Sequence, residues 1–195
     1  MLAVLLLLAA VTVTAEDAPP GHRSIAGRLL VATEAMRDPR FARTVLYMVR
    51  HDAGGAFGLV VNLPGNRVPY ERALSPFGLD VPPDSGDVQV YYGGPVDERR
   101  AFVLHTPDWR TEGTTVVEDG LAITEDPRAL QAVARGTGPR RALFILGHAG
   151  WGPGQLDAEL TTGAWAVAVA DERIVFDEDP KHKWIEAMTR RLLSL

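Results

Sequence analysis

Short runs of apolar and β-branched residues, separated by Pro, Gly and Asp, dominate the chain after its first 26 residues. Runs of this length between turn residues predict β-strands. The expected strands are Gly27–Thr33, Thr44–His51, Ala56–Leu63, Val88–Gly94, Ala101–Thr106, Thr114–Thr124, Arg141–Leu146 and Ala164–Ala170. The second and third of these predict a hairpin around the turn Asp52–Gly55, and Gly58 indicates a bulge or a close backbone approach.

Helical patterns are fewer. Glu125–Gly136 has acids and Pro127 at its start and a glycine at its end, as helices prefer. Gln155–Gly163 predicts a second helix. The Pro- and Gly-rich stretch Pro64–Asp87 shows no strong periodicity and leaves room for one helical piece at Tyr70–Leu74.

The last element predicts an amphipathic helix from Pro180 onward. Its apolar stripe consists of residues at helical spacing: Trp184, Met188, Leu192 and Leu195. Its basic residues are expected on the opposite, solvated face: Lys181, Lys183, Arg190 and Arg191. A membrane-surface role for that face is the alternative to a helix docked on the core.

Strands that arrive in pairs, with few helices between them, favour one α+β domain over a doubly wound parallel sheet. The expected sheet is mixed and mostly antiparallel. A chain of 195 residues suits a single domain with a sizeable core.

The N-terminus carries a separate signal. The apolar run from Leu2 to about Val13 is shorter than the roughly 20 residues of a membrane-spanning helix. Small residues at Val13 and Ala15 precede Glu16, as at a signal-peptidase site, although no Lys or Arg precedes the run.

We therefore expect a signal peptide over residues 1–15, a disordered mature N-terminus over 16–26 and a folded domain over 27–195. The mature protein would be periplasmic or secreted, with no stable membrane span after cleavage. The alternative is a cytoplasmic chain that retains the run as a buried strand or helix.

Composition narrows the chemistry. The formal net charge is −5, which argues weakly against a nucleic-acid partner, because phosphate-binding domains usually present a basic face. The chain has no cysteine, so thiolate metal sites, disulfides and cysteine nucleophiles are excluded.

The segment "LGHAGWGPGQLD" reads as a glycine-rich loop between a strand and a helix. It lacks the Lys and Ser/Thr of a phosphate-binding P-loop, the third glycine of a dinucleotide fingerprint and the serine of a hydrolase elbow. What remains is a set of backbone amides before a helix, which can attract an anion. The expected ligand-binding residues are His148, Gly150, Trp151, Gly152, Gly154 and Gln155, with Asn62 added from elsewhere. The alternative is a tight turn with Trp151 packed on the core.

No other motif predicts a catalytic centre, a metal site or a cofactor. The remaining histidines, His22, His51, His105 and His182, lack the spacing of a helical zinc site.

Three segments together resemble the YqgE/AlgH family. They are "LLVATEAMRDPRFARTVLYMVRHDAGGAFGLVVNLP", "YYGGPVDERRAFVLH" and "LGHAGWGPGQLDAEL…GAW", and the resemblance runs from about Leu29 to the helix that holds Trp184. It implies an α+β fold with a bent, partly barrel-like sheet. Family members are often labelled transcriptional regulators, most lack a leader, and the resemblance implies no particular biochemical activity.

The chain departs from the family pattern at three places. It has Glu34 where the family usually has proline, Asn62-Leu63-Pro64 where it has Asn-Arg-Pro, and His148 where it has tyrosine. The missing arginine weakens an anion site beside Asn62, and a cleaved leader would remove the protein from any promoter.

Three functions remain open. The first is an exported, non-enzymatic domain that binds a small ligand or a protein. The second is a cytoplasmic regulator acting on nucleic acid. The third is an enzyme that acts on a phosphorylated small molecule at the glycine-rich loop, which lacks a visible nucleophile–base pair.

Overall fold

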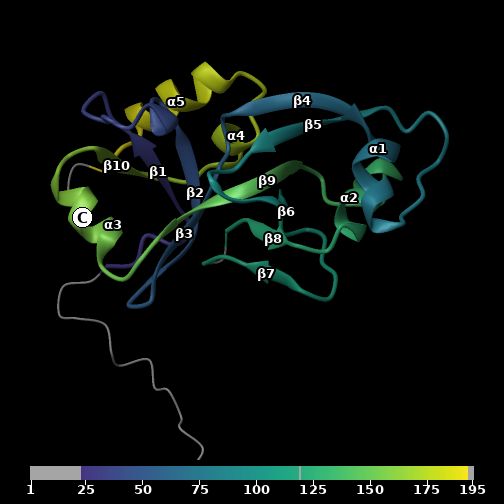
Figure 1. The fold of residues 1–195 in the computed structure, drawn as a ribbon, viewed down its shortest axis with the longest axis horizontal. Coiled ribbons are helices and arrows are strands. Elements are labelled where there is room, and N and C mark those ends of the chain that lie inside the picture. Colours follow the sequence, from purple (N-terminus) through teal and green to yellow (C-terminus); the bar gives the residue numbers. More distant parts are fainter. Residues whose placement is uncertain (1–22, 119, 193–195) are drawn as a thin grey trace, which may run out of the picture.

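The computed structural model describes residues 23–118 and 120–192 (Figure 1). The expected signal peptide and cleavage site lie outside these residues. The expected disordered segment reaches into them at its end, where Ile25 is buried and its N–H donates to Nδ1 of His51 at 3.4 Å. Ile25 therefore belongs to the folded part, although the folded domain was expected to begin at residue 27.

Strands are the main regular elements of the described chain. They are β1 (Arg28–Ala32), β2 (Val45–Asp52), β3 (Gly55–Val60), β4 (Pro64–Pro69), β5 (Asp87–Tyr92), β6 (Val96–His105), β7 (Thr114–Val116), β8 (Ala122–Thr124), β9 (Ala142–Trp151) and β10 (Trp165–Val169). The helices are η1 (Pro39–Phe41), α1 (Tyr70–Leu74), η2 (Ser75–Phe77), α2 (Arg128–Ala134), α3 (Gln155–Thr161), α4 (Glu172–Val175) and α5 (Pro180–Thr189). None of the described helices combines the length and apolar character needed to cross a membrane.

The strands form one curled sheet in the order β10-β1-β2-β3-β9-β6-β8-β7, with β5 beside β9 and β4 beside β5. Every pairing is antiparallel except that of β5 with β9. This confirms the α+β fold and the bent, mostly antiparallel sheet.

Strand β9 joins the two halves of the sheet (Figure 1). Its first part lies between β5 and β6, and its last three residues pair with β3. Both of its backbone edges are therefore occupied along much of its length, which fixes the position of the turn that follows it.

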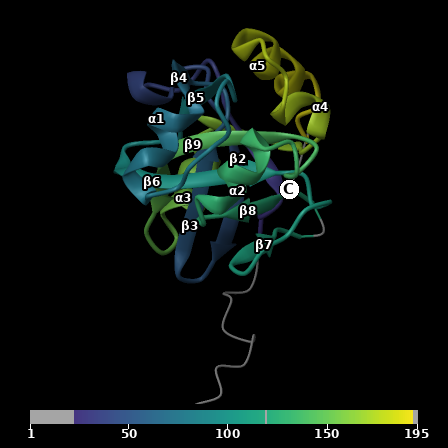
Figure 2. The ribbon, with the colours of Figure 1, turned by 90° about the vertical axis from the view of Figure 1, so that its right-hand side faces the viewer.

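Successive side chains of a strand point to opposite faces of the sheet. Neighbouring residues of one strand therefore belong to different apolar clusters. One cluster contains Leu29, Val31 and Tyr47 and is covered by α4 and α5. A second contains Leu30, Leu46 and Trp151 and is covered by α3 and η1. A third lies under α1 and α2, at the end of the molecule that faces the viewer in Figure 2.

Several local predictions are confirmed. The β2–β3 hairpin has the expected turn, and its register shifts between Met48 and Arg50, opposite Gly58. A Cβ on Gly58 would lie 2.8 Å from the Met48 sulfur, so the glycine allows the close approach expected there. Helix α1 has the residues predicted for it.

Other elements differ from the prediction. Strand β4 was not expected, and its side chains are mostly exposed, so it carries no alternating pattern. The single strand expected over Thr114–Thr124 is two antiparallel strands, β7 and β8, and the N–H of Val117 donates to the carbonyl of Leu121 between them at 2.9 Å. Helix α2 starts at Arg128, three residues later than expected, and α4 was not predicted.

The glycine-rich segment is the largest correction. Residues 147–151 continue strand β9, so only Gly152–Gly154 form the turn. Gly147 is needed because β9 passes very close to the segment after β5: a Cβ on Gly147 would lie 2.6 Å from the carbonyl oxygen of Gly94. A Cβ on Gly93 would in turn lie 2.3 Å from the carbonyl oxygen of Gly147. These glycines serve strand packing.

The last helix ends at Thr189, and the chain then returns to the sheet, where the N–H of Leu192 donates to the carbonyl of Val167 at 2.7 Å. Trp184 and Met188 pack on the core as predicted. Lys183 does not lie on a solvated face: it is fully buried.

Candidate functional site

A cavity of about 640 Å³ lies where the turn after β9 meets η1 and the start of β10. Its volume falls within the range of about 300–1,000 Å³ typical of small-molecule sites. We call it the tryptophan cavity. Its lining includes Arg37, Asp38, Arg40, Phe41, Val96, Gly150, Trp151, Gln155, Glu159 and Trp165.

The carboxylate of Glu159 is the polar centre of this cavity. The indole N–H groups of Trp151 and Trp165 both donate to Oε2 of Glu159, each at 2.9 Å. The two indole rings meet edge to face, with centroids 6.1 Å apart. Both tryptophans are buried, and a buried indole N–H needs an acceptor, so one half-buried carboxylate satisfies two donors.

Helix α3 supplies the next polar group. The side-chain amide of Gln155 donates to Oε1 of Glu159 at 2.9 Å, one helical turn away. Its oxygen accepts from the backbone N–H of Gly152 at 3.1 Å, and the N–H of Gln155 donates to the carbonyl of Gly152 at 3.1 Å. The backbone amides of Gly152 and Gln155, which precede the helix and were expected to attract an anion, are thus engaged within the turn.

The opposite wall comes from η1. Phe41 meets Trp165 edge to face at 5.7 Å. Arg40 and Asp38 form a forked ion pair with a shortest contact of 2.6 Å, so the guanidinium lowers the pKa of Asp38. The charges of this pair largely cancel.

Of the seven expected ligand-binding residues, Gly150, Trp151 and Gln155 line the tryptophan cavity. Gly152 and Gly154 form the adjoining turn, and Gly154 has the left-handed φ of 68° that favours glycine.

His148 lies on the other face of β9. Its ring packs against Phe57, with centroids 4.8 Å apart, and against Phe102 at 5.9 Å. Burial lowers its pKa, with a further contribution from nearby Arg100. Nδ1 is buried without a hydrogen-bond partner among the described residues. A neutral imidazole therefore fills an aromatic site away from Trp151.

Asn62 is also separate from the cavity. Its side-chain oxygen accepts from the N–H of Val45 at 2.7 Å, and its amide donates to the carbonyls of Arg43 and Pro180 at 2.9 and 3.3 Å. These three hydrogen bonds use both polar atoms of the Asn62 side chain, and they hold β2, the end of β3 and the start of α5 together.

Glu159 is the residue that sequence reasoning missed. A partial signal was present, because Gln155 and Glu159 share one helical face after Trp151. The second indole comes from β10, and only the fold brings it to the same carboxylate.

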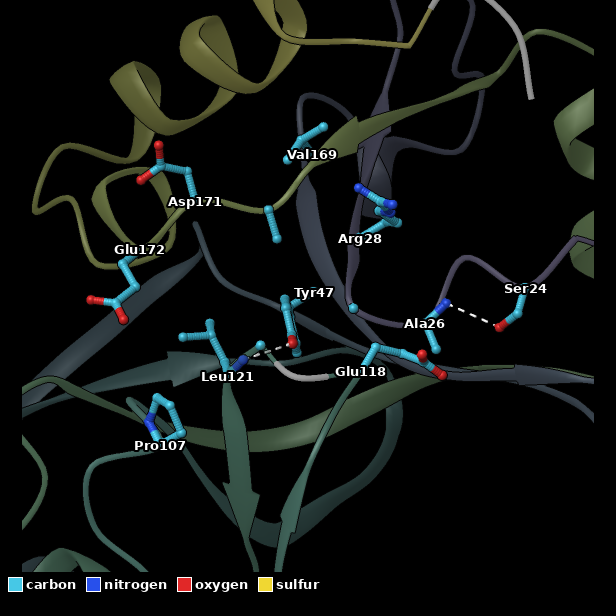
Figure 3. A pocket seen from close by; sticks show the side chains of 13 residues that line it. Ser24, Ala26, Arg28, Tyr47, Pro107, Glu118, Leu121, Val169, Asp171 and Glu172 are labelled. Carbon is cyan, nitrogen blue, oxygen red and sulfur yellow. Dashed lines mark hydrogen bonds between the residues drawn. The ribbon is translucent and has the colours of Figure 1, made fainter.

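A second cavity, of about 490 Å³, opens between β1, the end of β10 and the turn before β8 (Figure 3). We call it the tyrosine cavity, because the buried Tyr47 lies at its floor. The Tyr47 hydroxyl accepts the N–H of Leu121 at 3.1 Å, and burial raises the pKa of this phenol to about 12. Two acidic residues that line the tyrosine cavity already form ion pairs. Asp171 pairs with Arg173 at 2.8 Å, and Glu172 pairs with Arg140 at 2.8 Å.

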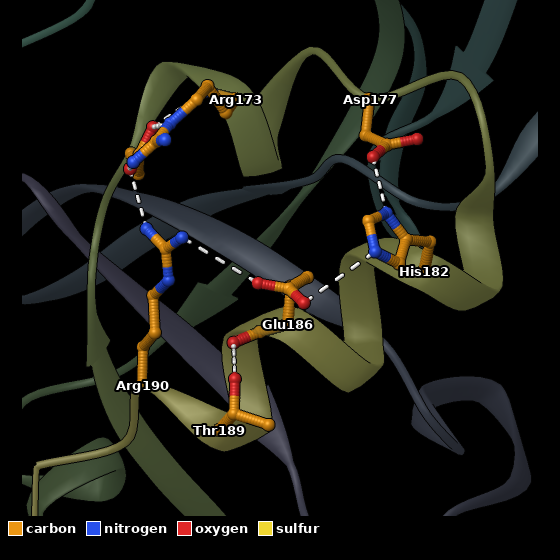
Figure 4. Close-up of polar contacts among 7 residues, drawn as sticks. Arg173, Asp177, His182, Glu186, Thr189 and Arg190 are labelled. Carbon is orange, nitrogen blue, oxygen red and sulfur yellow. Dashed lines mark hydrogen bonds and ion pairs between the residues drawn. The ribbon is translucent and has the colours of Figure 1, made fainter.

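Beside this cavity, a chain of charges connects α4 to α5 (Figure 4). Asp171 accepts from both Arg173 and Arg190, and these bonds hold its pKa far below the usual range. His182 lies 2.6 Å from Asp177 and 3.6 Å from Glu186, and the Asp177 hydrogen bond raises the pKa of His182. The chain is largely exposed and fixes the position of α5.

Lys183 faces the core from α5. Its ammonium donates to the carbonyl of Val61 at 2.6 Å and lies 4.9 Å from the centre of the Tyr91 ring. Burial lowers its pKa to about 8. Another buried base, His105, forms hydrogen bonds with the carbonyl of Thr106 at 2.8 Å and the hydroxyl of Thr124 at 2.9 Å, and these bonds hold its ring within the fold.

These features define a single-domain α+β protein with a curled sheet and a preformed cavity walled by aromatic side chains. The chain belongs to the AlgH-like family, whose model matches residues 29–193. The family resemblance of the sequence is thereby confirmed.

Known relatives agree with this assignment. A UPF0301 protein of Rhodospirillum rubrum is 43% identical over 175 residues, which cover 87% of this chain and 91% of the relative. The solution structure of the AlgH protein from Pseudomonas aeruginosa is 37% identical, covers 92% of this chain and 94% of its own, and superposes with a TM-score of 0.73. A protein of Corynebacterium diphtheriae, 24% identical over 86% of this chain and 87% of its own, shares the fold with a TM-score of 0.65.

Proposed function

We propose that the protein is an exported, non-enzymatic binding domain that holds a small ligand in the tryptophan cavity. The observation that carries this proposal is the fixed constellation of Trp151, Glu159 and Trp165 at a cavity of ligand size. Rigid aromatic walls with a few oriented polar groups are the usual composition of a small-molecule site.

The chemistry of the lining favours binding over catalysis. Its ionisable groups are Arg37, Asp38, Arg40 and Glu159, and the two carboxylates already accept hydrogen bonds from fixed neighbours. Among the described residues that line this cavity there is one hydroxyl, that of Thr162, which donates to the carbonyl of Glu159 at 2.7 Å, and there is no Ser, His or Lys. A base beside a nucleophile is the arrangement that covalent catalysis uses.

A matched pair of variants tests binding at this cavity. Val96 lines the tryptophan cavity and Val169 the tyrosine cavity, and both valines lie on strands with 42% exposure. A thermal-shift screen of amines, amino acids, nucleotides and sugar phosphates should find compounds that stabilise the full-length protein and Val169→Trp but not Val96→Trp. Stabilisation lost in Val169→Trp instead, or none in any protein, would contradict the proposal.

Export is supported by the apolar run Leu2 to Val13 and the small residues before Glu16, all of which precede the part matched by the family model. Fractionation of the host with N-terminal sequencing of the recovered protein tests it. A periplasmic or secreted chain that starts at Glu16 is expected. An intact cytoplasmic chain would overturn export and restore nucleic acid as a partner to examine.

A further inference from the structure

We infer that the ligand of the tryptophan cavity carries a compact cationic group, of the primary ammonium class, that binds to the carboxylate of Glu159. This inference rests on the proposed function and concerns the same cavity. It follows from the hydrogen bonds that the Glu159 carboxylate accepts and from the residues that line the cavity around it.

Glu159 receives three hydrogen bonds, all from neutral donors. Trp151 and Trp165 donate to Oε2, and Gln155 donates to Oε1. Among the described residues, no Lys, Arg or His nitrogen lies within 4.0 Å of this carboxylate. The indoles and the amide therefore orient the carboxylate without neutralising its charge.

The carboxylate also keeps room for another donor. An ionised carboxylate offers about four lone-pair positions, of which the three neighbours take three. The remaining position is on Oε1, the oxygen that accepts only from Gln155. A charged donor placed there makes a stronger bond than a neutral one.

The other walls of the cavity suit a cation as well. Trp151 and Trp165 contribute aromatic surface, and aromatic faces attract cations, whereas the Phe41 ring already has the Arg40 guanidinium 5.9 Å from its centre. Of the two arginines in the lining, Arg40 is held by the fork of Asp38, which leaves Arg37 as the second positive charge near the site. Because the charges of Arg40 and Asp38 cancel, Glu159 provides the negative charge that a bound cation meets beside the two indoles.

An ammonium ion, with three donors on one nitrogen, fits a single open acceptor position better than a carboxylate or phosphate group does. An anion would face Oε1 directly, and like charges repel at contact distance. Amines are therefore expected to bind here, and the phosphorylated ligands that the glycine-rich segment of the sequence suggested are not.

The test is an NMR titration of the full-length protein with 15N-labelled tryptophan. The probes share one carbon chain: n-butylammonium, n-butanol and butyrate. The indole N–H signals of Trp151 and Trp165 report on the bonds to Glu159, and those of Trp109 and Trp184 serve as internal controls. Butylammonium should shift the first two signals at lower concentration than butanol, and butyrate should shift neither.

Glu159→Gln removes the charge and keeps an oxygen that accepts from the indoles. We expect it to weaken butylammonium binding by about tenfold, which corresponds to roughly 1.4 kcal/mol, and to leave butanol binding unchanged. Glu112→Gln, at an exposed position outside the cavity, should bind as the wild type does.

The outcomes distinguish the inference from the proposed function. If butanol or butyrate binds as well as butylammonium, or if Glu159→Gln binds butylammonium with full affinity, the cation assignment fails while the cavity remains a ligand site. If none of the probes shifts the two indole signals, the cation assignment fails, and the proposed function then depends on the thermal-shift screen. Should Glu159→Gln not fold, the comparison of the three probes on the wild type, repeated in high salt that weakens an ion pair, decides the matter.

Discussion

Glu159 and Trp165 are joined by a 2.9 Å hydrogen bond that links the middle of α3 to the first residue of β10. The same carboxylate oxygen accepts the indole of Trp151 at the end of β9. One side chain thus ties together the helix and the two strands that border the tryptophan cavity, and the shape of the cavity depends on it.

This arrangement predicts a large stability cost when the acceptor is removed. Glu159→Ala leaves two buried indole N–H groups without a partner, and we expect it to lower the free energy of unfolding by about 2–4 kcal/mol. Glu159→Gln keeps an acceptor and should cost less than about 1 kcal/mol. Urea unfolding measures both, with Glu112→Ala as a surface control expected within about 0.5 kcal/mol of the wild type. Equal stability of the Ala and Gln variants would show that the indoles do not depend on this acceptor.

The glycines at the crossing of β9 and the segment after β5 predict a second, separable effect. Gly147 and Gly113 both have positive φ, 73° and 81°, but a Cβ on Gly113 would meet nothing within 4 Å, whereas one on Gly147 would lie 2.6 Å from a backbone oxygen. Both substitutions to alanine carry a conformational cost of about 1–2 kcal/mol.

Gly147→Ala should cost a further 1–3 kcal/mol or so, because neither backbone can move aside easily. The midpoints of chemical unfolding for the two variants measure the difference directly. If both alanines destabilise the protein equally, the close approach of Gly147 to Gly94 does not constrain the fold.

Much of the fold could be predicted from local patterns, because those patterns are produced by local packing. The β2–β3 hairpin has a turn and β-branched strands within one short segment, and α1 and α3 begin at residues that the sequence indicates. Strand β4 could not be predicted, since its exposed side chains leave no periodicity and its backbone bonds are made to the distant β5.

Three of the expected ligand-binding residues, Gly150, Trp151 and Gln155, line the tryptophan cavity, whereas His148 and Asn62 do not. Trp151 and Gln155 stand beside each other in the sequence, but the glycines between them suggested a loop for a phosphate. Their hydrogen bonds to Glu159 became visible only in the fold, which also brings Trp165 of β10 to the same carboxylate. Contacts between distant segments decide both.

Lys183 leads to a prediction about pH. Burial lowers its pKa from 10.5 to about 8, so the unfolded chain binds more protons than the folded one between these values. Stability should therefore rise with pH from about 8 to 10.5, a change worth roughly 3 kcal/mol. The gain is lost as the pH falls through the folded pKa.

Lys183→Met should remove this rise, whereas Lys181→Met, at an exposed position of the same helix, should keep it. Unfolding free energies at pH 7.5, 9 and 10.5 for the three proteins check the prediction. The difference between the wild type and Lys183→Met cancels the titration of other groups, so a difference that does not change with pH would contradict it.

For His182, the dependence of stability on pH should have the opposite sign to that of Lys183. Its bond to Asp177 raises its pKa above 6.5, so the pair stabilises the fold fully below the pKa of the unfolded chain and loses its effect as the pH rises through the folded pKa. Proton NMR of the imidazole should show this raised pKa, and Asp177→Asn should lower it. A pKa at or below 6.5 in the wild type would mean that the Asp177 bond does not form in solution.

The most direct measurement of the central claim is a crystal structure of the protein with the compound that stabilises it best. The compound should lie in the tryptophan cavity, in contact with Trp165 and Gln155 and with its donor group on Glu159. A compound found in the tyrosine cavity beside Tyr47, with the tryptophan cavity holding only solvent, would contradict ligand binding at Glu159.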